Sequence, residues 1–220
     1  MDGPTASLFQ SVLFQNILFA TASLVALTNP LAELPVFLGV TQGESPARVR
    51  KDALRVAVGV WVVLGTMAVI GLKILPLFGV SLAAFRSAGG LLVIVMGMEM
   101  LQGREPVAQY EMAEPDDEGA DALWVPLVMP MLAGPGSIVA TVSLSIREPS
   151  LPLGWIPVAT LTGVSISAVL VGVILASAVE IRAGLGHRRL RIFTRFSGLI
   201  LVAIGFQMGF TGVAEFFQIG

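Results

Sequence analysis

Several stretches of this chain contain no Asp, Glu, Lys or Arg, and six of them are candidate membrane spans. They are 3–32, 56–72, 87–98, 122–146, 149–179 and 196–214. A helix needs about 20 apolar residues to cross a hydrocarbon core of ~30 Å. Five of the stretches meet this length, some with help from their flanks, and 87–98 meets it when extended through Glu99 to about Gln102. The pattern therefore predicts six transmembrane helices.

The predicted fold is all-α, that of a polytopic membrane protein. The six helices are expected at about 8–40, 54–75, 82–102, 123–146, 151–179 and 192–217. Only 13% of the 220 residues are charged, whereas soluble domains have about 25%. The chain has no cysteine, which excludes disulfides and thiolate metal sites. No nucleotide-binding, hydrolase, metalloprotease or nucleic-acid motif is present, so we expect no cofactor, no metal and no nucleic acid.

The placement of basic residues predicts the topology. With six crossings, the loops 41–55, 103–122 and 180–195 share one side and hold ten of the thirteen Lys and Arg residues. The positive-inside rule assigns this side to the cytoplasm, so both termini are expected outside. If 123–146 were a re-entrant hairpin that did not cross the membrane, the loop 180–195 would move to the outer side. Six basic residues would then lie inside and seven outside, and the charge bias between the two sides would vanish. A broken helix that still crosses is therefore favoured.

The two halves of the chain share a proline pattern. Pro30 and Pro35 recur one hundred residues later as Pro130 and Pro135. A proline inside a helix removes a backbone donor and clashes with the preceding turn, so the first helix of each half is predicted to be broken. An Arg followed three residues later by Gly, at 86–89 and 195–198, also matches in order.

Because each half has three helices, the halves enter the membrane from opposite sides, as in an inverted-topology repeat. The expected organisation is repeat 1 over 1–102, an acidic cytoplasmic connector over 103–122 and repeat 2 over 123–220.

The paired breaks are the candidate substrate-binding site. Broken helices in matching places are the usual position of a transport site, since free N–H groups at a half-helix N-terminus suit an anionic group and unpaired carbonyls suit a cation. The predicted residues are Thr28, Asn29, Pro30, Glu33, Gly134, Pro135, Gly136 and Ser137. The glycines are expected to allow unusual φ and close backbone approach. The competing interpretation is a simple proline kink with glycines for packing.

Five polar or charged residues are candidates for coupling or gating: Glu33, Glu99, Arg86, Arg195 and Gln207. An intramembrane carboxylate is a functional candidate by default, but Glu33 and Glu99 are compatible with positions at the cytoplasmic interface. Arg86 and Arg195 are expected to anchor helix starts by snorkelling; gating, or pairing with a carboxylate, is the alternative.

The chain resembles the MarC family of six-helix membrane proteins, also described as neutral amino acid transporters. The matching segments are 29–30, 35–38, 85–90, 125–127, 130–138, 194–195 and 198–201. Among them, Leu-Ala-Gly-Pro-Gly at 132–136 is quite specific. The resemblance implies a bacterial or archaeal cytoplasmic membrane and small neutral amino acids as substrates. The family often has Asp where this chain has Asn29, and an uncharged polar residue where it has Glu33, which suggests that Glu33 replaces the acid in coupling.

The leading functional hypothesis is thus a secondary transporter of a small neutral amino acid or similar zwitterion, in which one repeat rocks against the other. Its expected partners are this solute, membrane lipid, a coupling proton or sodium ion, and a second copy of the chain in a homo-oligomer. The alternatives are a transporter or exporter of another small polar solute, and an accessory membrane protein without transport. An intramembrane enzyme is disfavoured, because the only histidine, His187, lies in a basic loop.

Overall fold

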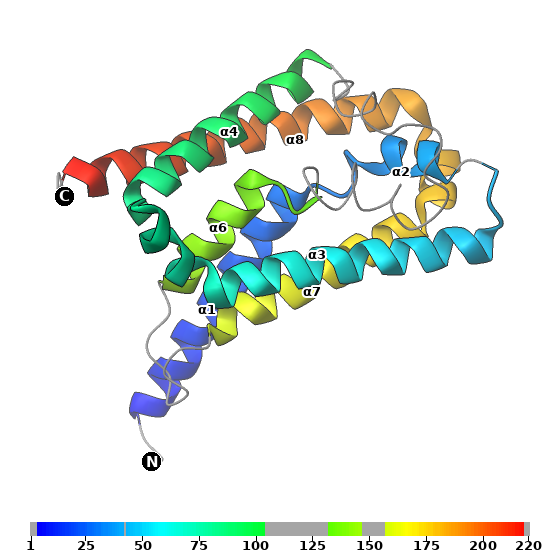
Figure 1. Ribbon diagram of the computed structural model, residues 1–220. Helices are drawn as coiled ribbons and strands as arrows, with labels where there is room; N and C mark the ends of the chain where they lie inside the picture. The colour runs from blue at the N-terminus through cyan, green and yellow to red at the C-terminus, as the bar shows by residue number, and fades with distance from the viewer. Residues whose placement is uncertain (1–3, 42, 104–131, 147–156, 218–220) are drawn as a thin grey trace.

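The computed structural model describes residues 4–41, 43–103, 132–146 and 157–217, and each regular element in these ranges is helical (Figure 1). The elements are α1 (Pro4–Thr28), α2 (Leu34–Val40), α3 (Pro46–Ile74), the short 3-10 helix η1 (Leu75–Phe78), α4 (Leu82–Gln102), α6 (Pro135–Ile146), α7 (Val158–Ala176) and α8 (Ala178–Phe217). The predicted all-α class is confirmed.

Within the described ranges, five helical segments are long and apolar enough to cross a membrane. They are Gln10–Thr28, Pro46–Gly71, Leu82–Gln102, Val158–Ala176 and Ile192–Phe217. The predicted bounds 82–102 are confirmed. α6 is a shorter apolar helix of 12 residues, and the part of the predicted helix 123–146 before Leu132 lies outside the described residues. Large apolar side chains such as Leu91, Val95 and Phe210 are exposed, as expected for lipid-facing positions.

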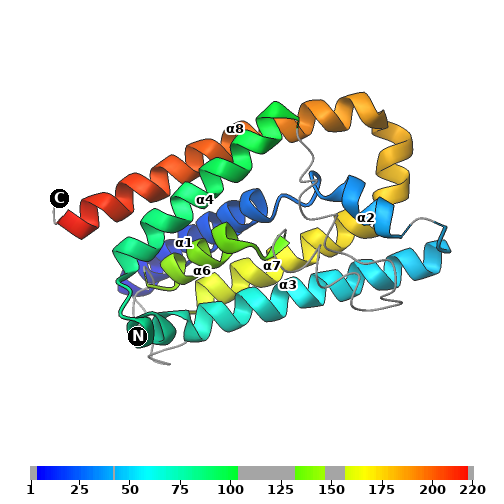
Figure 2. The same ribbon diagram turned by 45° about the horizontal axis from the view of Figure 1, so that its top comes forward.

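Two predicted boundaries are wrong, because hydrophobicity marks the membrane-spanning part of a helix and not its whole length. α3 begins at Pro46 instead of 54, where Ser45 caps the helix by accepting from the backbone N–H of Arg48. The expected loop 180–195 is helical, since α8 begins at Ala178 and bends before it runs beside α4 (Figure 2). The helix predicted over 151–179 ends at Ala176 in α7, and 151–156 lie outside the described residues.

α4 and α8 pack antiparallel through glycines. A Cβ added at Gly90 would lie 2.6 Å from the carbonyl oxygen of Gly205, and one added at Gly97 would lie 2.7 Å from that of Gly198. The reciprocal contacts, from Gly205 to Gly90 and from Gly198 to Gly97, are both 2.7 Å. As residue numbers rise along α4 they fall along α8, and the absence of side chains lets the two backbones touch.

The other long helices form a second group. α7 packs against both α1 and α3, and α6 lies between this group and α4. The two ends of the chain and η1 lie toward one end of the bundle, whereas the turn from α2 to α3 lies at the other (Figure 1). This turn leads into Arg48, Asp52 and Arg55, where the buried carboxylate of Asp52 accepts from both arginines.

Candidate functional site

The first helix is broken where the prolines predicted, and the backbone turns at Asn29. α1 ends at Thr28 and α2 begins at Leu34, with Pro35 in its first turn. Asn29 has φ of 38°, in the left-handed region that Asn tolerates better than most residues. Its side-chain Nδ2 donates to Sδ of Met100 on α4 at 3.8 Å. The break is therefore held against α4.

The second predicted break falls at the start of α6, and the residues directly before Leu132 lie outside the described part of the chain. The helix begins at Pro135, and the Ser137 hydroxyl donates to the carbonyl of Leu132 at 3.0 Å. A Cβ added at Gly136 would lie 2.3 Å from Val93 on α4 and 3.7 Å from Leu27 on α1. The end of α1, the first turn of α6 and the middle of α4 therefore meet in one place.

The role predicted for the glycines is corrected in one respect. In the described residues the glycines with positive φ are Gly43, Gly79 and Gly103, and neither Gly134 nor Gly136 is among them. The left-handed conformation belongs to Asn29 instead. Gly136 is required for close helix approach, because the Val93 side chain occupies the space that its own side chain would fill.

The two segments share more than a proline in the first turn of the helix that follows. Thr41 donates to the carbonyl of Phe37 at 2.8 Å, and Thr141 donates to that of Ser137 at 2.7 Å. Each hydroxyl donates to the carbonyl four residues earlier in the chain. Thr41 and Thr141 are one hundred residues apart, like the prolines, so the two halves also match at this position. Pro130, the partner of Pro30 in the sequence pattern, lies outside the described residues.

The polar residues predicted at the breaks are not equally free to bind a solute. The hydroxyl of Thr28 donates to the carbonyl of Val25 at 3.4 Å, and that of Ser137 is used within its own turn. By contrast, the Oε2 atom of Glu33 is buried and has no hydrogen-bond partner among the described residues. A buried unpaired carboxylate oxygen is costly, so Glu33 is the group at the breaks that most needs a partner.

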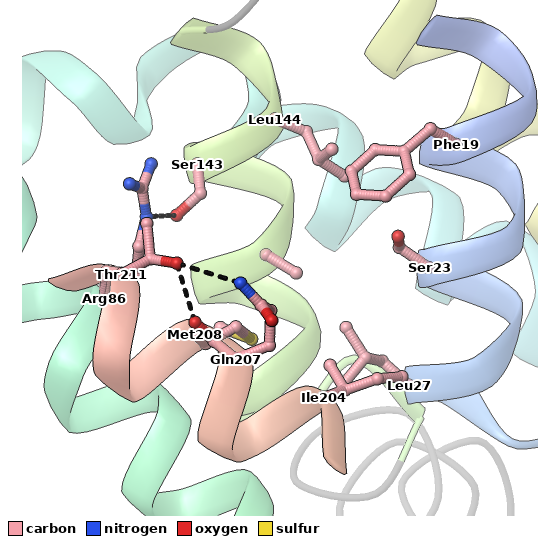
Figure 3. Close-up of a pocket in the computed structure, with 11 residues that line it drawn as sticks. Phe19, Ser23, Leu27, Arg86, Ser143, Leu144, Ile204, Gln207, Met208 and Thr211 are labelled. Atoms are coloured by element: carbon pink, nitrogen blue, oxygen red, sulfur yellow. Dashed lines mark hydrogen bonds between the residues drawn. The ribbon is translucent and has the colours of Figure 1, made fainter. Parts of the chain in front are cut away.

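A cavity of about 460 Å³ lies next to the breaks, between α1, α4, α6 and α8 (Figure 3). Leu27 joins the two regions, because it lines the cavity and also faces Gly136. One face of α6 contributes Ala140, Ser143 and Leu144 to the wall. The remaining wall mixes apolar with polar side chains: Phe19, Ile204 and Met208 with Ser23, Gln207 and Thr211.

Arg86 lines this cavity and is buried, with its side chain 5% exposed. Its Nε donates to Oγ of Ser143 at 3.2 Å, and its Nη1 donates to Oε1 of Glu215 on α8. The expectation of a snorkelling Arg86 is therefore wrong, because α8 supplies a carboxylate that makes burial of the guanidinium tolerable. The counterpart Arg195 is exposed and lies beside Gly103, at the end of α4.

The other candidates are placed as follows. Gln207 lines the cavity and donates from Nε2 to the hydroxyl of Thr211 at 3.4 Å. Glu99 is exposed near the end of α4. Sequence reasoning missed Ser23, Ser143 and Glu215. The sequence marks Glu215 in one way only: it is the acidic residue that directly follows the last uncharged stretch, 196–214.

Comparison with known proteins gives one consistent family. Residues 14–217 match the family described as MarC family integral membrane protein. A UPF0056 membrane protein of Pyrococcus abyssi is 37% identical over 89% of this chain and 93% of its own length. The UPF0056 inner membrane protein MarC of Escherichia coli is 30% identical over 92% of this chain and 96% of its own length. The UPF0056 membrane protein YvbG of Bacillus subtilis is 28% identical over 94% of this chain and 99% of its own length.

No solved structure matches this chain. The family match covers the helix breaks and all four helices around the cavity. By both the family match and its relatives, this chain belongs to the MarC family of integral membrane proteins.

Proposed function

We propose that this protein is a secondary transporter of small neutral amino acids or similar zwitterions. The observation that carries the proposal is the cavity beside the break after Thr28 and the start of α6, with the buried side chain of Arg86 in its wall. Its volume lies in the range of small-ligand pockets, about 300–1,000 Å³. An apolar wall with a few convergent polar groups suits a solute that has a short aliphatic side chain and charged ends.

The repeat organisation predicted from sequence supports alternating access. Pro35 with Thr41, and Pro135 with Thr141, occupy equivalent places in the two halves. The antiparallel contact of α4 and α8 is the relation expected between the third helices of inverted repeats. We therefore propose two inverted repeats in six crossings, with both termini outside the cell and the protein in the cytoplasmic membrane.

The packing suggests which helices move together. α4 and α8 touch backbone to backbone, so they form one rigid pair, while α1, α3 and α7 form another group. α6 contacts helices of both groups, and the cavity is lined by residues of α1, α4, α6 and α8. We propose that access alternates as the α4–α8 pair moves against the α1–α3–α7 group. In this scheme each moving unit contains helices from both repeats, whereas the sequence suggested one repeat rocking against the other.

Reconstitution tests the proposal. Purified protein in liposomes is expected to take up labelled alanine, serine or glycine. Ala140→Leu places a larger side chain in the cavity wall and should abolish uptake without unfolding the protein. Ala22→Leu, on an exposed part of α1, is the matched control and should transport like the wild type.

A second variant tests the break itself. Gly134→Leu adds a bulky side chain at a buried position in the second break, and uptake should be lost there as well. If folded wild-type protein transports none of the three amino acids, the transporter proposal fails and an accessory role becomes the better reading. If Ala140→Leu transports normally, the solute does not pass through this cavity.

A further inference from the structure

We propose that Arg86 binds the carboxylate of the transported solute in exchange for its contact with Glu215, which it keeps when the solute is absent. The inference deepens the proposed function and rests on it for the identity of the solute. The binding group is the guanidinium of Arg86 and the competing ligand is the Glu215 side chain. Ser143 acts as a positioning residue that fixes the guanidinium through Nε.

The exposures of the two partners favour exchange. The Arg86 side chain is 5% exposed, whereas that of Glu215 is 44% exposed. When Glu215 leaves, water can solvate its carboxylate, but the guanidinium would remain buried without a counter-charge. An unpaired buried charge is strongly unfavourable. Glu215 should therefore leave only when another anionic group takes its place.

The cavity has the electrostatic character that such an exchange requires. Arg86 is the only charged residue among those that line it in the described part of the chain. A guanidinium has five N–H donors in a planar fork that matches a carboxylate, and the bonds to Ser143 and Glu215 use two of them. The Arg86 side chain in the cavity wall thus provides a fixed positive charge with N–H donors that these two bonds do not use.

The remaining polar groups are neutral. Ser23, Gln207 and Thr211 provide hydroxyl and amide oxygens that can accept from an ammonium group, but no carboxylate lines the wall to attract one. The carboxylate should therefore contribute more to binding than the amino group. This distinguishes the site from one at the helix breaks, where Glu33 is the charged group.

Contact between Glu215 and Arg86 also joins the C-terminal end of α8 to the N-terminal part of α4. Replacing this contact with a solute contact removes a link between two helices of the same rigid pair. It leaves the glycine contacts of that pair in place. Solute binding can therefore free the last turn of α8, beyond the close approach of Gly212 to the α4 backbone, without separating α4 from α8.

Binding to purified full-length protein tests the inference, with alanine, propionate and ethylamine as probes in calorimetry. Alanine and propionate should bind, and ethylamine should not. If propionate binds as well as alanine, the shared carboxylate is sufficient; if only alanine binds, the amino group is also required. Binding of ethylamine without propionate would overturn the proposal.

Three variants give the decisive readouts. Arg86→Gln should weaken alanine binding at least about 30-fold, because it removes the buried charged partner. Arg86→Lys should weaken it roughly 10-fold, because the planar fork is lost. Glu215→Gln should tighten binding roughly 10-fold, because a neutral competitor holds the guanidinium less strongly. Arg195→Gln, at the exposed counterpart, is the matched control and should leave binding unchanged.

The Glu215→Gln result separates exchange from a purely structural ion pair. Glu215 is partly exposed and the substitution conserves its shape, so the variant should fold. Unchanged or weaker binding in this variant overturns the inference. The two proposals also fail separately. Transport that does not depend on Arg86 rejects this inference alone, whereas Arg86-dependent binding without any flux rejects the transporter and leaves the binding site.

Discussion

Gly90 lies where α4 touches the backbone of α8, and replacing it with Ala should force the two helices apart. The added Cβ would lie 2.5 Å from the backbone nitrogen of Gly209 and 2.6 Å from the carbonyl oxygen of Gly205. Ordinary contact begins at 3.4 Å. The obstructing atoms belong to the backbone of α8, so no side-chain rotation can relieve the clash. The two helices must therefore move apart by most of the difference between 2.5 Å and 3.4 Å.

The expected cost follows from overpacking. Inserting a methyl group into a packed interior typically costs about 1–3 kcal/mol, and the upper part of this range applies where backbone is displaced. The helix propensity of Ala offsets roughly 1 kcal/mol of it. A net loss of about 2 kcal/mol in the free energy of unfolding should lower the melting temperature by about 4–8 °C for a chain of this length.

The measurement is thermal unfolding in detergent micelles, followed by far-UV circular dichroism. Gly209→Ala is the matched control, because it changes the next glycine of the same helix seam but an added Cβ there meets nothing within 4 Å. It should be neutral or slightly stabilising. Equal melting temperatures for Gly90→Ala and wild type, or equal destabilisation by both variants, would refute the backbone-to-backbone contact.

Two further predictions concern the helix breaks. Gly136→Ala should destabilise the protein by about 1–2 kcal/mol, because its Cβ would lie 2.3 Å from the Val93 side chain; Val93→Ala in the same protein should restore most of the loss in the same melting assay. Glu33→Gln should leave alanine binding intact but remove the dependence of uptake on a pH gradient, because it removes the buried carboxylate that would take up the proton. Gradient-dependent uptake in Glu33→Gln liposomes would exclude Glu33 from coupling.

Local sequence determined where the chain enters and leaves the apolar phase. The uncharged stretch around 87–98 predicted Leu82–Gln102 correctly, because membrane spanning depends on the apolar character of consecutive residues. The proline pattern likewise predicted the break after Thr28 and is consistent with the helix start at Pro135, since the effect of a proline on a helix is local. The same signal could not give the length of α3 or α8, whose polar ends are helical outside the apolar stretches.

The site was determined by contacts between residues far apart in the chain. Arg86 and Glu215 are separated by 129 positions, and their pairing depends on the antiparallel packing of α4 and α8 through Gly90, Gly97 and their partners. No local pattern distinguishes Arg86 from Arg195, although one is buried and the other exposed. The sequence by itself thus established a membrane protein whose first helix is broken at prolines. Only the tertiary structure decided that a buried arginine, paired with Glu215, lies in the wall of a cavity beside this break, because burial and charge pairing are properties of the packed bundle.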